Sequence, residues 1–126
     1  MTPPRVLVVE DHPLNRKLVR DVLVAAGYDV VEAATGEEGL TAAANQPPDL
    51  VLMDLQLPGI DGTETLRRLR EGTLGRDVPV IAVTALAMPS DRAHAAEAGF
   101  DGYVEKPISI RALPVQVQAF LDGVGS

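Results

Sequence analysis

An aspartate directly follows a short apolar run near the middle of the chain. Residues 50–53 read Leu-Val-Leu-Met, Asp54 comes next, and the turn signals Pro58-Gly59 and Asp61-Gly62 follow. Such a run predicts a strand that is buried on both faces. Its last residue would lie at the carboxyl edge of a sheet, where open α/β proteins bind ligands. Asp54 is therefore the first candidate for chemistry, with helix or turn capping as its structural alternative.

Other polar residues follow three further apolar runs. Glu10 and Asp11 come after the first run, Thr84 ends the fourth, and Lys106 follows the fifth. Carboxylates that crowd at one sheet edge either acquire raised pKa values or recruit a cation. Oxygen ligands select a hard ion, and a shallow, solvent-facing site suits Mg²⁺, which keeps several waters. We therefore expect a Mg²⁺ (or Mn²⁺) site formed with Asp54.

A carboxylate beside a divalent cation, a hydroxyl group and a lysine indicates phosphoryl transfer onto the protein itself. Asp54 would attack phosphorus and form an aspartyl phosphate, a known kind of covalent chemistry for carboxylates. The cation, Lys106 and Thr84 would neutralise the phosphoryl oxygens. Each residue alone has an ordinary structural explanation, such as a surface charge or a strand-end hydroxyl. It is the convergence of all five residues on one edge that favours the functional interpretation.

The elements that must position these residues alternate strictly between strand and helix. We expect strands at 5–10, 29–34, the segment ending at Asp54, 78–83 and 101–105, and helices at 13–26, 36–45, 62–71, 90–98 and 109–121. This alternation predicts one doubly wound α/β domain over 1–126, with a core at about 4–122 and a tail at 123–126. The flavodoxin-like strand order 2-1-3-4-5 would place the first and third strands side by side.

Local signals support the predicted helix ends. Pro13 suits a first helical turn, where its missing N–H costs nothing, and Gly27 suits a left-handed stop. Thr35 is a capping residue for the second helix. Pro114 lies inside the last predicted helix, where it is tolerable only near the first turn.

Composition restricts the function further. The 126 residues are 46% hydrophobic and 3% aromatic, contain no cysteine and carry a formal net charge of −7. The negative charge and the few aromatic residues argue against nucleic-acid binding. No segment has the length and apolarity of a membrane span, and a chain without disulfides is typical of the cytoplasm. Cations and other proteins are the expected partners.

Four stretches of the chain resemble the receiver domains of response regulators, the CheY-like superfamily. They are VLVVED at 6–11, LVLMDLQLPGIDG at 50–62, VIAVTA at 80–85 and YVEKPIS at 103–109. The runs VEDHPLNRKL at 9–18 and TALAMPSDR at 84–92 are similar to those of DivK-like single-domain regulators and to receiver modules of hybrid histidine kinases. The resemblance covers about residues 4–122 and implies a role in a two-component phosphorelay.

The resemblance also assigns roles to the residues around the expected cation. Asp54 would be the phosphoacceptor, and its donor would be a phosphohistidine on a histidine kinase or a histidine phosphotransfer protein. Asp11 would bind Mg²⁺ directly, Glu10 would bind it through water, and the backbone carbonyl of Gln56 would be a further ligand. Glu10 stands where many relatives have Asp, so the geometry of that water would differ here.

Three further roles follow from the same resemblance. Lys106 would hold the phosphoryl group and precede a cis peptide bond at Pro107. Thr84 would move toward the phosphoryl oxygens, and Tyr103 would change rotamer with it. The predicted helix 90–98 is rich in alanine and lacks large apolar anchors, so it should be easily displaced. We expect the face made by this helix, strand 101–105 and helix 109–121 to switch, although a merely solvent-facing helix explains the same composition.

A second surface should receive the phosphodonor. We expect it to be formed by Leu14, Asn15 and Leu18 of the first helix, with Pro107 and Ile108 opposite. Leu86 lies two residues past Thr84 and cannot hydrogen-bond a water, which predicts slow loss of the phosphoryl group. The two histidines, His12 and His94, lack a nearby cluster that would complete a transition-metal site, so both are interpreted as surface residues.

Two functions of other classes use similar elements. A flavin carrier would need a hydroxyl-rich loop after the first strand, where this chain has Glu10-Asp11-His12-Pro13, and aromatic residues to hold the ring. A phosphatase with an aspartyl intermediate would need an acid two residues after the nucleophile, where this chain has Gln56. A phosphate shuttle, or a receiver module of a hybrid kinase, remains the alternative within the receiver interpretation.

Overall fold

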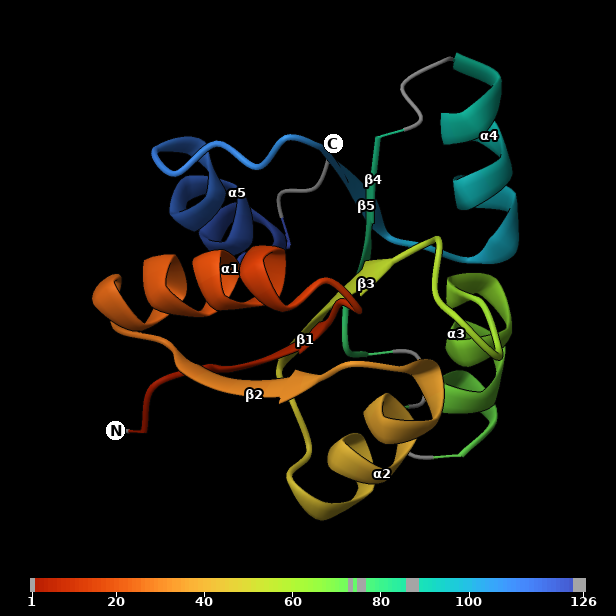
Figure 1. The fold of residues 1–126 in the computed structure, drawn as a ribbon, viewed down its shortest axis with the longest axis horizontal. Helices are drawn as coiled ribbons and strands as arrows, with labels where there is room; N and C mark the ends of the chain where they lie inside the picture. Colours follow the sequence, from red (N-terminus) through yellow and green to blue (C-terminus); the bar gives the residue numbers. More distant parts are fainter. Residues whose placement is uncertain (1, 73, 75–76, 86–88, 124–126) are drawn as a thin grey trace.

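The computed structural model describes residues 2–72, 74, 77–85 and 89–123, and it has a single five-stranded sheet within them (Figure 1). The strands are β1 Arg5–Val9, β2 Asp29–Ala33, β3 Leu50–Asp54, β4 Val80–Thr84 and β5 Gly102–Glu105. All neighbouring strands are parallel, and their order is β2-β1-β3-β4-β5. The predicted α/β class, strand order and doubly wound topology are confirmed.

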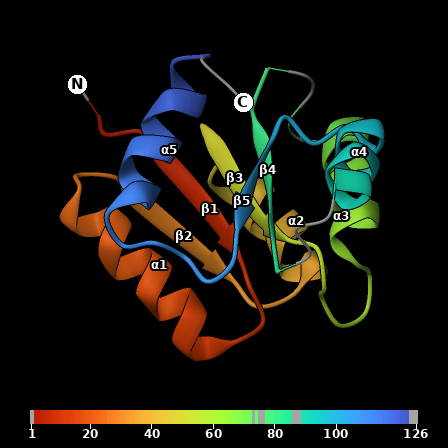
Figure 2. The same cartoon turned by 90° about the horizontal axis from the view of Figure 1, so that it is seen from above.

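Five helices connect the strands. They are α1 Pro13–Ala25, α2 Gly36–Asn45, α3 Gly62–Glu71, α4 Pro89–Ala98 and α5 Ala112–Leu121. Helices α1 and α5 cover one face of the sheet, and α2, α3 and α4 cover the other (Figures 1 and 2). Each crossover therefore returns the chain to the same end of the sheet, as parallel strands require.

Alternate residues of the strands pack into two separate hydrophobic cores, one on each face of the sheet. Val6, Val8, Leu50 and Leu52 pack with α1 and α5, whereas their neighbours Leu7, Val9, Val51 and Met53 pack with the helices of the opposite face. All five residues of β3 are buried. A central parallel strand covered on both faces must be apolar throughout, which explains why the Asp54 strand is so clearly recognisable in the sequence.

The register of the sheet brings the strand ends together. Val9 lies opposite Met53, Asp54 opposite Val83, and Thr84 opposite Glu105. The residues that follow β1, β3 and β5 therefore gather at one edge of the sheet. The strand spacing of about 4.8 Å sets the scale of their separation.

The predicted helix starts and stops are mostly confirmed. Thr35 accepts a hydrogen bond from the backbone N–H of Glu38 and so caps α2. Asp61 caps α3 in the same way through Glu64. Gly27 has a φ of 98°, the left-handed conformation expected at the end of α1.

Several predicted boundaries differ by one residue, and two are wrong by two residues or more. Strand β4 begins at Val80 rather than Val78, because the Val78 carbonyl is bound by the Arg70 guanidinium and Pro79 has no N–H for the ladder. Helix α5 begins at Ala112 rather than Ser109, because the Ser109 hydroxyl accepts the N–H of Ala112. Pro114 therefore lies in the first turn of α5, the only part of the helix where it was expected to be tolerable.

None of the helices in the described part of the chain is long and apolar enough to span a membrane. Of the predicted tail, residues 124–126 lie outside the described residues. That the whole of 1–126 is one domain stays a prediction.

Candidate functional site

Asp54 ends β3 and points a buried carboxylate at the carboxyl edge of the sheet. The residue is 4% exposed. Its Oδ1 accepts the backbone N–H of Gln56 at 3.0 Å, and its Oδ2 accepts Lys106 Nζ at 3.1 Å. The carboxylate is thus held in one orientation by two donors: the bond from Gln56 is the turn-capping bond of the structural alternative, and the contact with Lys106 is additional to it.

Lys106 is shared between two carboxylates from different strands. Its Nζ lies 2.9 Å from Glu10 Oε1 as well as 3.1 Å from Asp54 Oδ2. Partial burial by itself would lower the pKa of Lys106, but the hydrogen bonds to Glu10 and Asp54 outweigh it and raise that pKa. The lysine therefore stays charged and is the counterion of the site.

Glu10 is more buried than a solvent-facing site would allow. It is 4% exposed, like Asp54. Its pKa is raised, first by burial and then by the neighbouring Asp54 carboxyl, with Lys106 acting in the opposite direction. The prediction of a shallow, solvent-facing site is therefore wrong for these two carboxylates, which lie in a recess below the more exposed Asp11.

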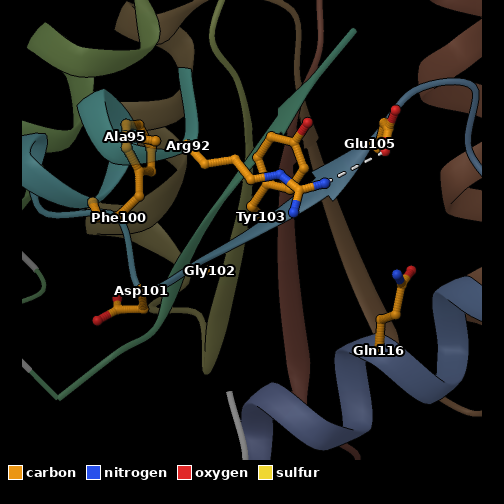
Figure 3. Close-up of a pocket in the computed structure, with 9 residues that line it drawn as sticks. Arg92, Ala95, Phe100, Asp101, Gly102, Tyr103, Glu105 and Gln116 are labelled. Atoms are coloured by element: carbon orange, nitrogen blue, oxygen red, sulfur yellow. Dashed lines mark ion pairs between the residues drawn. The ribbon is translucent and has the colours of Figure 1, made fainter. Parts of the chain in front are cut away.

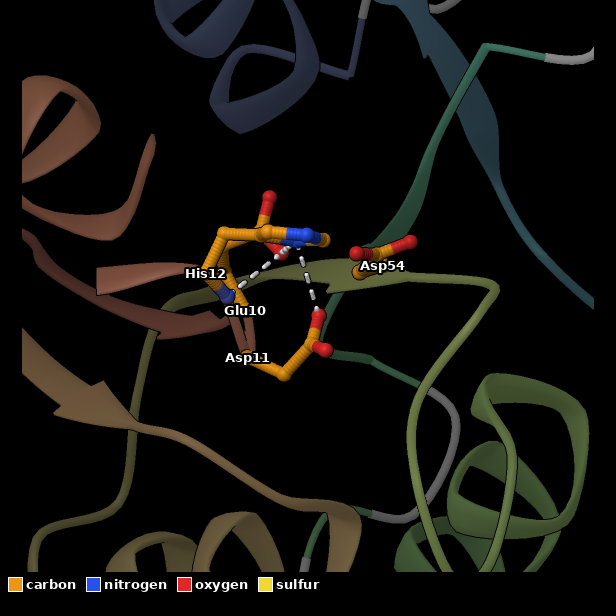
Figure 4. A group of neighbouring side chains, drawn as sticks. All are labelled: Glu10, Asp11, His12 and Asp54. Atoms are coloured by element: carbon orange, nitrogen blue, oxygen red, sulfur yellow. Dashed lines mark hydrogen bonds and ion pairs between the residues drawn. The ribbon is translucent and has the colours of Figure 1, made fainter. Parts of the chain in front are cut away.

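The side chains at this edge form a candidate cation site. One ligand atom from each of Glu10, Asp11, His12 and Asp54 can be chosen so that all four lie within 4.8 Å of one another (Figure 4). Asp11 Oδ1 is buried as an atom and has no hydrogen-bond partner in the described part of the chain. An orphaned carboxylate oxygen beside two other carboxylates fits a divalent cation.

His12 was expected to be a surface residue with no acidic cluster nearby, and the second half of that expectation is wrong. Its side chain is 67% exposed, yet its Nδ1 lies 3.3 Å from Asp11 Oδ1 and 3.7 Å from Glu10 Oε2. The sequence did contain the signal, since the three residues are consecutive. His94 lies on the exposed part of α4, as expected for a surface residue.

Arg16 is a residue of the site that the sequence did not single out. Its guanidinium donates a 2.9 Å hydrogen bond to the backbone carbonyl of Glu10 and lies 3.4 Å from Glu32 on β2. It ties the acidic loop to the edge strand, so it positions the carboxylates without touching Asp54. A basic residue one turn into the helix after an acidic pair is the signal that could have found it.

Thr84 and Tyr103 lie on the neighbouring strands. Thr84 is 2% exposed, and its carbonyl accepts the backbone N–H of Lys106 at 2.9 Å. Tyr103 is half-buried on β5, with the Arg92 guanidinium 4.8 Å from its ring centroid. The peptide bond between Lys106 and Pro107 is cis, as the resemblance implied. Both predicted switch residues therefore lie on strands beside the site.

The predicted donor surface is a groove. Asn15 and Leu18 of α1 face Pro107 and Ile108 across a hollow of about 300 Å³ that also exposes Lys106. Leu14 stands beside it and is 82% exposed. Four of the five residues named from the sequence thus line one groove that also reaches Lys106, while Leu14 is not among its lining residues.

Gln56 contributes its backbone to the site, while its side chain is exposed. The N–H of Gln56 is bound to Asp54, and the assignment of its carbonyl as a cation ligand stays a prediction. Leu86, expected to slow dephosphorylation, lies outside the described residues.

Gly62 should be essential to the position of Asp54, which gives a first testable prediction. A Cβ at Gly62 would lie 2.6 Å from the backbone oxygen of Asp54 and 3.0 Å from Leu55 Cα. Backbone atoms cannot move aside as a side-chain tip can, so Gly62→Ala should destabilise the fold by about 1–3 kcal/mol. Urea unfolding measures this, with Gly72→Ala as a control whose Cβ would meet one atom at 3.3 Å. Equal stability of Gly62→Ala and the parent chain would contradict the prediction.

Comparison with known proteins gives the same family from sequence and from structure. The family model for the response regulator receiver domain matches residues 6–118. The polar-differentiation response regulator DivK of Brucella anthropi is 40% identical over 119 residues, which are 94% of this chain and 97% of that protein.

Solved structures agree with this assignment. A CheY-like receiver domain protein from Methanospirillum hungatei has a TM-score of 0.87 at 32% identity, covering 97% of this chain and 96% of its own. The receiver domain of a sensor histidine kinase from Pseudomonas aeruginosa has a TM-score of 0.86 at 35% identity, covering 95% and 98%. That protein is described with a magnesium ion coordinated in its active-site cleft. The fold, the acidic edge with its lysine and these similarities together lead to one conclusion: this chain belongs to the response regulator receiver domain family.

Proposed function

We propose that this chain accepts a phosphoryl group on Asp54 from a phosphohistidine and thereby switches a protein-binding surface. The observation that carries the proposal is the buried Asp54 carboxylate with Lys106 Nζ at 3.1 Å, beside the acidic loop of a receiver domain. The same lysine, which follows β5, binds Glu10, so one ammonium group contacts the carboxylate that follows β1 and the one that ends β3. Such an arrangement is suited to receiving an anion at Asp54.

The transfer requires a single displacement at phosphorus. An oxygen of Asp54 attacks, the new P–O bond makes an acyl phosphate, and the P–N bond of the donor breaks with its electron pair remaining on the imidazole nitrogen. Lys106 lies where it can neutralise the phosphoryl oxygens as they arrive. The Thr84 hydroxyl comes from the neighbouring strand, and we assign it the role of sensing those oxygens.

A divalent cation belongs to this proposal. Glu10, Asp11 and Asp54 would hold it, with the carbonyl of Gln56, and the orphaned Asp11 Oδ1 is the observation that supports this set. When bound, Mg²⁺ or Mn²⁺ supplies positive charge against the phosphoryl oxygens and the attacking carboxylate. The contribution of the chain itself is to hold the three carboxylates close together, and burial together with the neighbouring Asp54 raises the pKa of Glu10.

The direct test is phosphoryl uptake by the full chain. The protein is incubated with Mg²⁺ and a small acyl phosphate, or with a phosphorylated histidine phosphotransfer protein, and its intact mass is measured. We expect the addition of one phosphoryl group, sensitive to hydroxylamine as acyl phosphates are. A protein that stays unmodified with every donor would refute the proposal.

Donor docking is expected to use the groove between α1 and the segment after β5. Leu14 of α1 precedes the groove residue Asn15 and is 82% exposed, and its substitution by aspartate should slow transfer from a protein donor about tenfold. Uptake from a small acyl phosphate should stay unchanged, because that donor needs no docking surface. An equal loss with both kinds of donor would instead indicate damage to the site itself.

The output surface is proposed at α4, β5 and α5, where the structure has a hollow of about 490 Å³ (Figure 3). Arg92 of α4 lies over the Tyr103 ring and 3.9 Å from Glu105, so it links helix and strand. Of α4, only Ala95 is buried. A change at Tyr103 would therefore act on a helix with few apolar anchors.

Hydrogen exchange tests this output surface. With a phosphoryl mimic bound at Asp54, the amide protection of residues 89–98 should change by several-fold, because the helix is biased between two arrangements. Helix α2, on the far side of the sheet from α5, serves as the reference and should keep its protection. Unchanged exchange across 89–98 in both states would exclude α4 as the switched element.

The proposal also covers enzymatic activity, the type of regulator and the location of the protein. We assign it no reaction on a separate substrate, only its own phosphorylation and dephosphorylation. We propose that it acts as a single-domain regulator. The alternatives are a phosphate shuttle and a receiver module of a hybrid kinase, and the similarity to the receiver domain of a sensor histidine kinase supports the second alternative. Onward transfer to a phosphotransfer histidine would support the shuttle. The cytoplasmic location expected from the composition is also part of the proposal.

A further inference from the structure

His12 turns a ring nitrogen into the acidic recess although its side chain is largely exposed. Its Nδ1 lies 3.3 Å from Asp11 Oδ1 and 3.7 Å from Glu10 Oε2. Figure 4 shows the imidazole beside the carboxylates of Glu10 and Asp11, with Asp54 across from it. No other histidine lies in this group of side chains. The recess thus has an aromatic nitrogen among its oxygen atoms.

The backbone leaves this imidazole without a structural task. His12 is the N-cap residue of α1, a position whose side chain commonly accepts a helix N–H, but its ring makes no such bond. Pro13 follows at the first helical position and needs no capping partner for its nitrogen. The backbone N–H of His12 points back to Glu10 Oε2 at 3.4 Å. The local fold therefore places the His12 ring at the acidic loop, although the ring does not cap the helix.

The spacing of His12 Nδ1 from its two nearest carboxylates suits ligands of one small ion, and the four candidate ligand atoms lie within 4.8 Å of one another. Ligands at 2.0–2.2 Å from a tetrahedral ion lie roughly 3.4 Å apart, close to the 3.3 Å and 3.7 Å found for His12 Nδ1. Asp11 Oδ1, the nearer of these neighbours, has no hydrogen-bond partner among the described residues. The ring nitrogen and this oxygen are thus placed as adjacent ligands rather than as a hydrogen-bonded pair.

We propose that His12 Nδ1 is a ligand at this site and makes it a binding site for Zn²⁺ or a similar first-row transition ion in competition with Mg²⁺. The inference rests on the cation site of the proposed function and adds the nitrogen ligand to it. Imidazole is a good ligand for Zn²⁺ and Ni²⁺, whereas Mg²⁺ prefers oxygen. A site with three carboxylates and one imidazole should therefore favour Zn²⁺ over Mg²⁺ more strongly than a site with oxygen ligands alone.

The test compares two histidines by nitrogen NMR and by calorimetry. The chain has only His12 and His94, so ¹⁵N imidazole spectra contain an internal reference. On titration of the full chain with Zn²⁺, the Nδ1 resonance of His12 should shift strongly while His94 stays unchanged. Mg²⁺ should leave both rings unchanged, because its ligands are the carboxylates.

Matched variants measure the contribution of the ring to affinity. His12→Ala should weaken Zn²⁺ binding by about tenfold or more and leave the Mg²⁺ affinity within about twofold. His12→Asn, a favourable N-cap residue, keeps the test valid if the alanine variant folds poorly, and it should show the same selective loss. His94→Ala is the control and should bind both ions as the parent chain does.

The possible results separate the inference from the proposed function. If Zn²⁺ leaves the His12 ring unshifted, or if His12→Ala and the parent chain bind Zn²⁺ equally, His12 is only an electrostatic neighbour of Asp11 and the inference is overturned. In that case Mg²⁺ binding and phosphoryl uptake would continue to support the proposed function. If the parent chain binds neither ion, the inference and the cation part of the proposed function are both wrong.

Discussion

Asp54→Asn should abolish phosphoryl uptake while leaving the fold intact. The asparagine side chain has the same shape, and its oxygen can still accept the N–H of Gln56, as Asp54 Oδ1 does at 3.0 Å. It lacks the anionic nucleophile, so the rate of acyl phosphate formation should fall by at least about 10³-fold. Intact mass measurement after incubation with a phosphodonor and Mg²⁺ gives this rate directly.

The fold of this variant provides its own control. Lys106 keeps the Glu10 carboxylate at 2.9 Å as its counterion after Asp54 loses its charge. We therefore expect a cooperative thermal transition and an unchanged far-ultraviolet circular dichroism spectrum. If Asp54→Asn takes up label as fast as the parent chain, the phosphoacceptor is another residue and the central proposal is wrong.

Lys106→Met should impair both stability and phosphoryl uptake, and the two effects have one cause. Methionine retains much of the side-chain volume but removes the positive charge between Glu10 and Asp54. Two buried carboxylates without their counterion should destabilise the fold by about 3 kcal/mol. Uptake should fall by about 10²–10³-fold, because an arriving phosphoryl group would meet only negative charge from the chain.

A divalent cation should separate these two effects. Mg²⁺ should restore part of the stability of Lys106→Met, because a cation bound to the remaining carboxylates stabilises the folded state, but it should not restore the rate. Urea unfolding with and without Mg²⁺ makes this measurement. Lys17→Met is the matched control, since Lys17 pairs with Asp21 on the exposed surface of α1 and its loss should be undetectable. Similar unfolding curves for both variants would argue against a structural role for Lys106.

The sequence predicted the elements well because their signals are local. Thr35 and Gly27 mark helix ends through bonds and backbone conformations within a few residues, and both were identified correctly. The two boundary errors arise at β4, where Arg70 and Pro79 together prevent an earlier start, and at α5, where the Ser109 hydroxyl accepts the N–H of Ala112 and sets the helix start. Pro79 and Ser109 are local signals that the predicted boundaries did not use, whereas the hydrogen bond from Arg70 of α3 to the Val78 carbonyl depends on how α3 packs against the sheet.

Some residues of the candidate site could likewise be predicted from the sequence, whereas others required the tertiary structure. Each apolar run showed which polar residue would follow it, so Asp54, Glu10 and Lys106 were found at their strand ends without coordinates. The part played by Arg16 needed the fold, because a basic residue one turn into a helix has several possible partners and the start of α1 places its guanidinium on the Glu10 carbonyl. The interpretation of His12 was incomplete for the same reason, since the direction of its ring follows from that helix start.

The amino-acid sequence by itself determined the order of strands and helices along the chain, the acidic and basic residues at the strand ends, and the resemblance that identifies the family. Only the tertiary structure decided that Lys106 lies between Glu10 and Asp54, that both carboxylates are buried, and that Asp11 Oδ1 accepts no hydrogen bond from the described residues. The reason is that Asp54 and Lys106 are 52 positions apart. Their distance depends on the register of three parallel strands and on the helices packed against them, and no local sequence pattern specifies either.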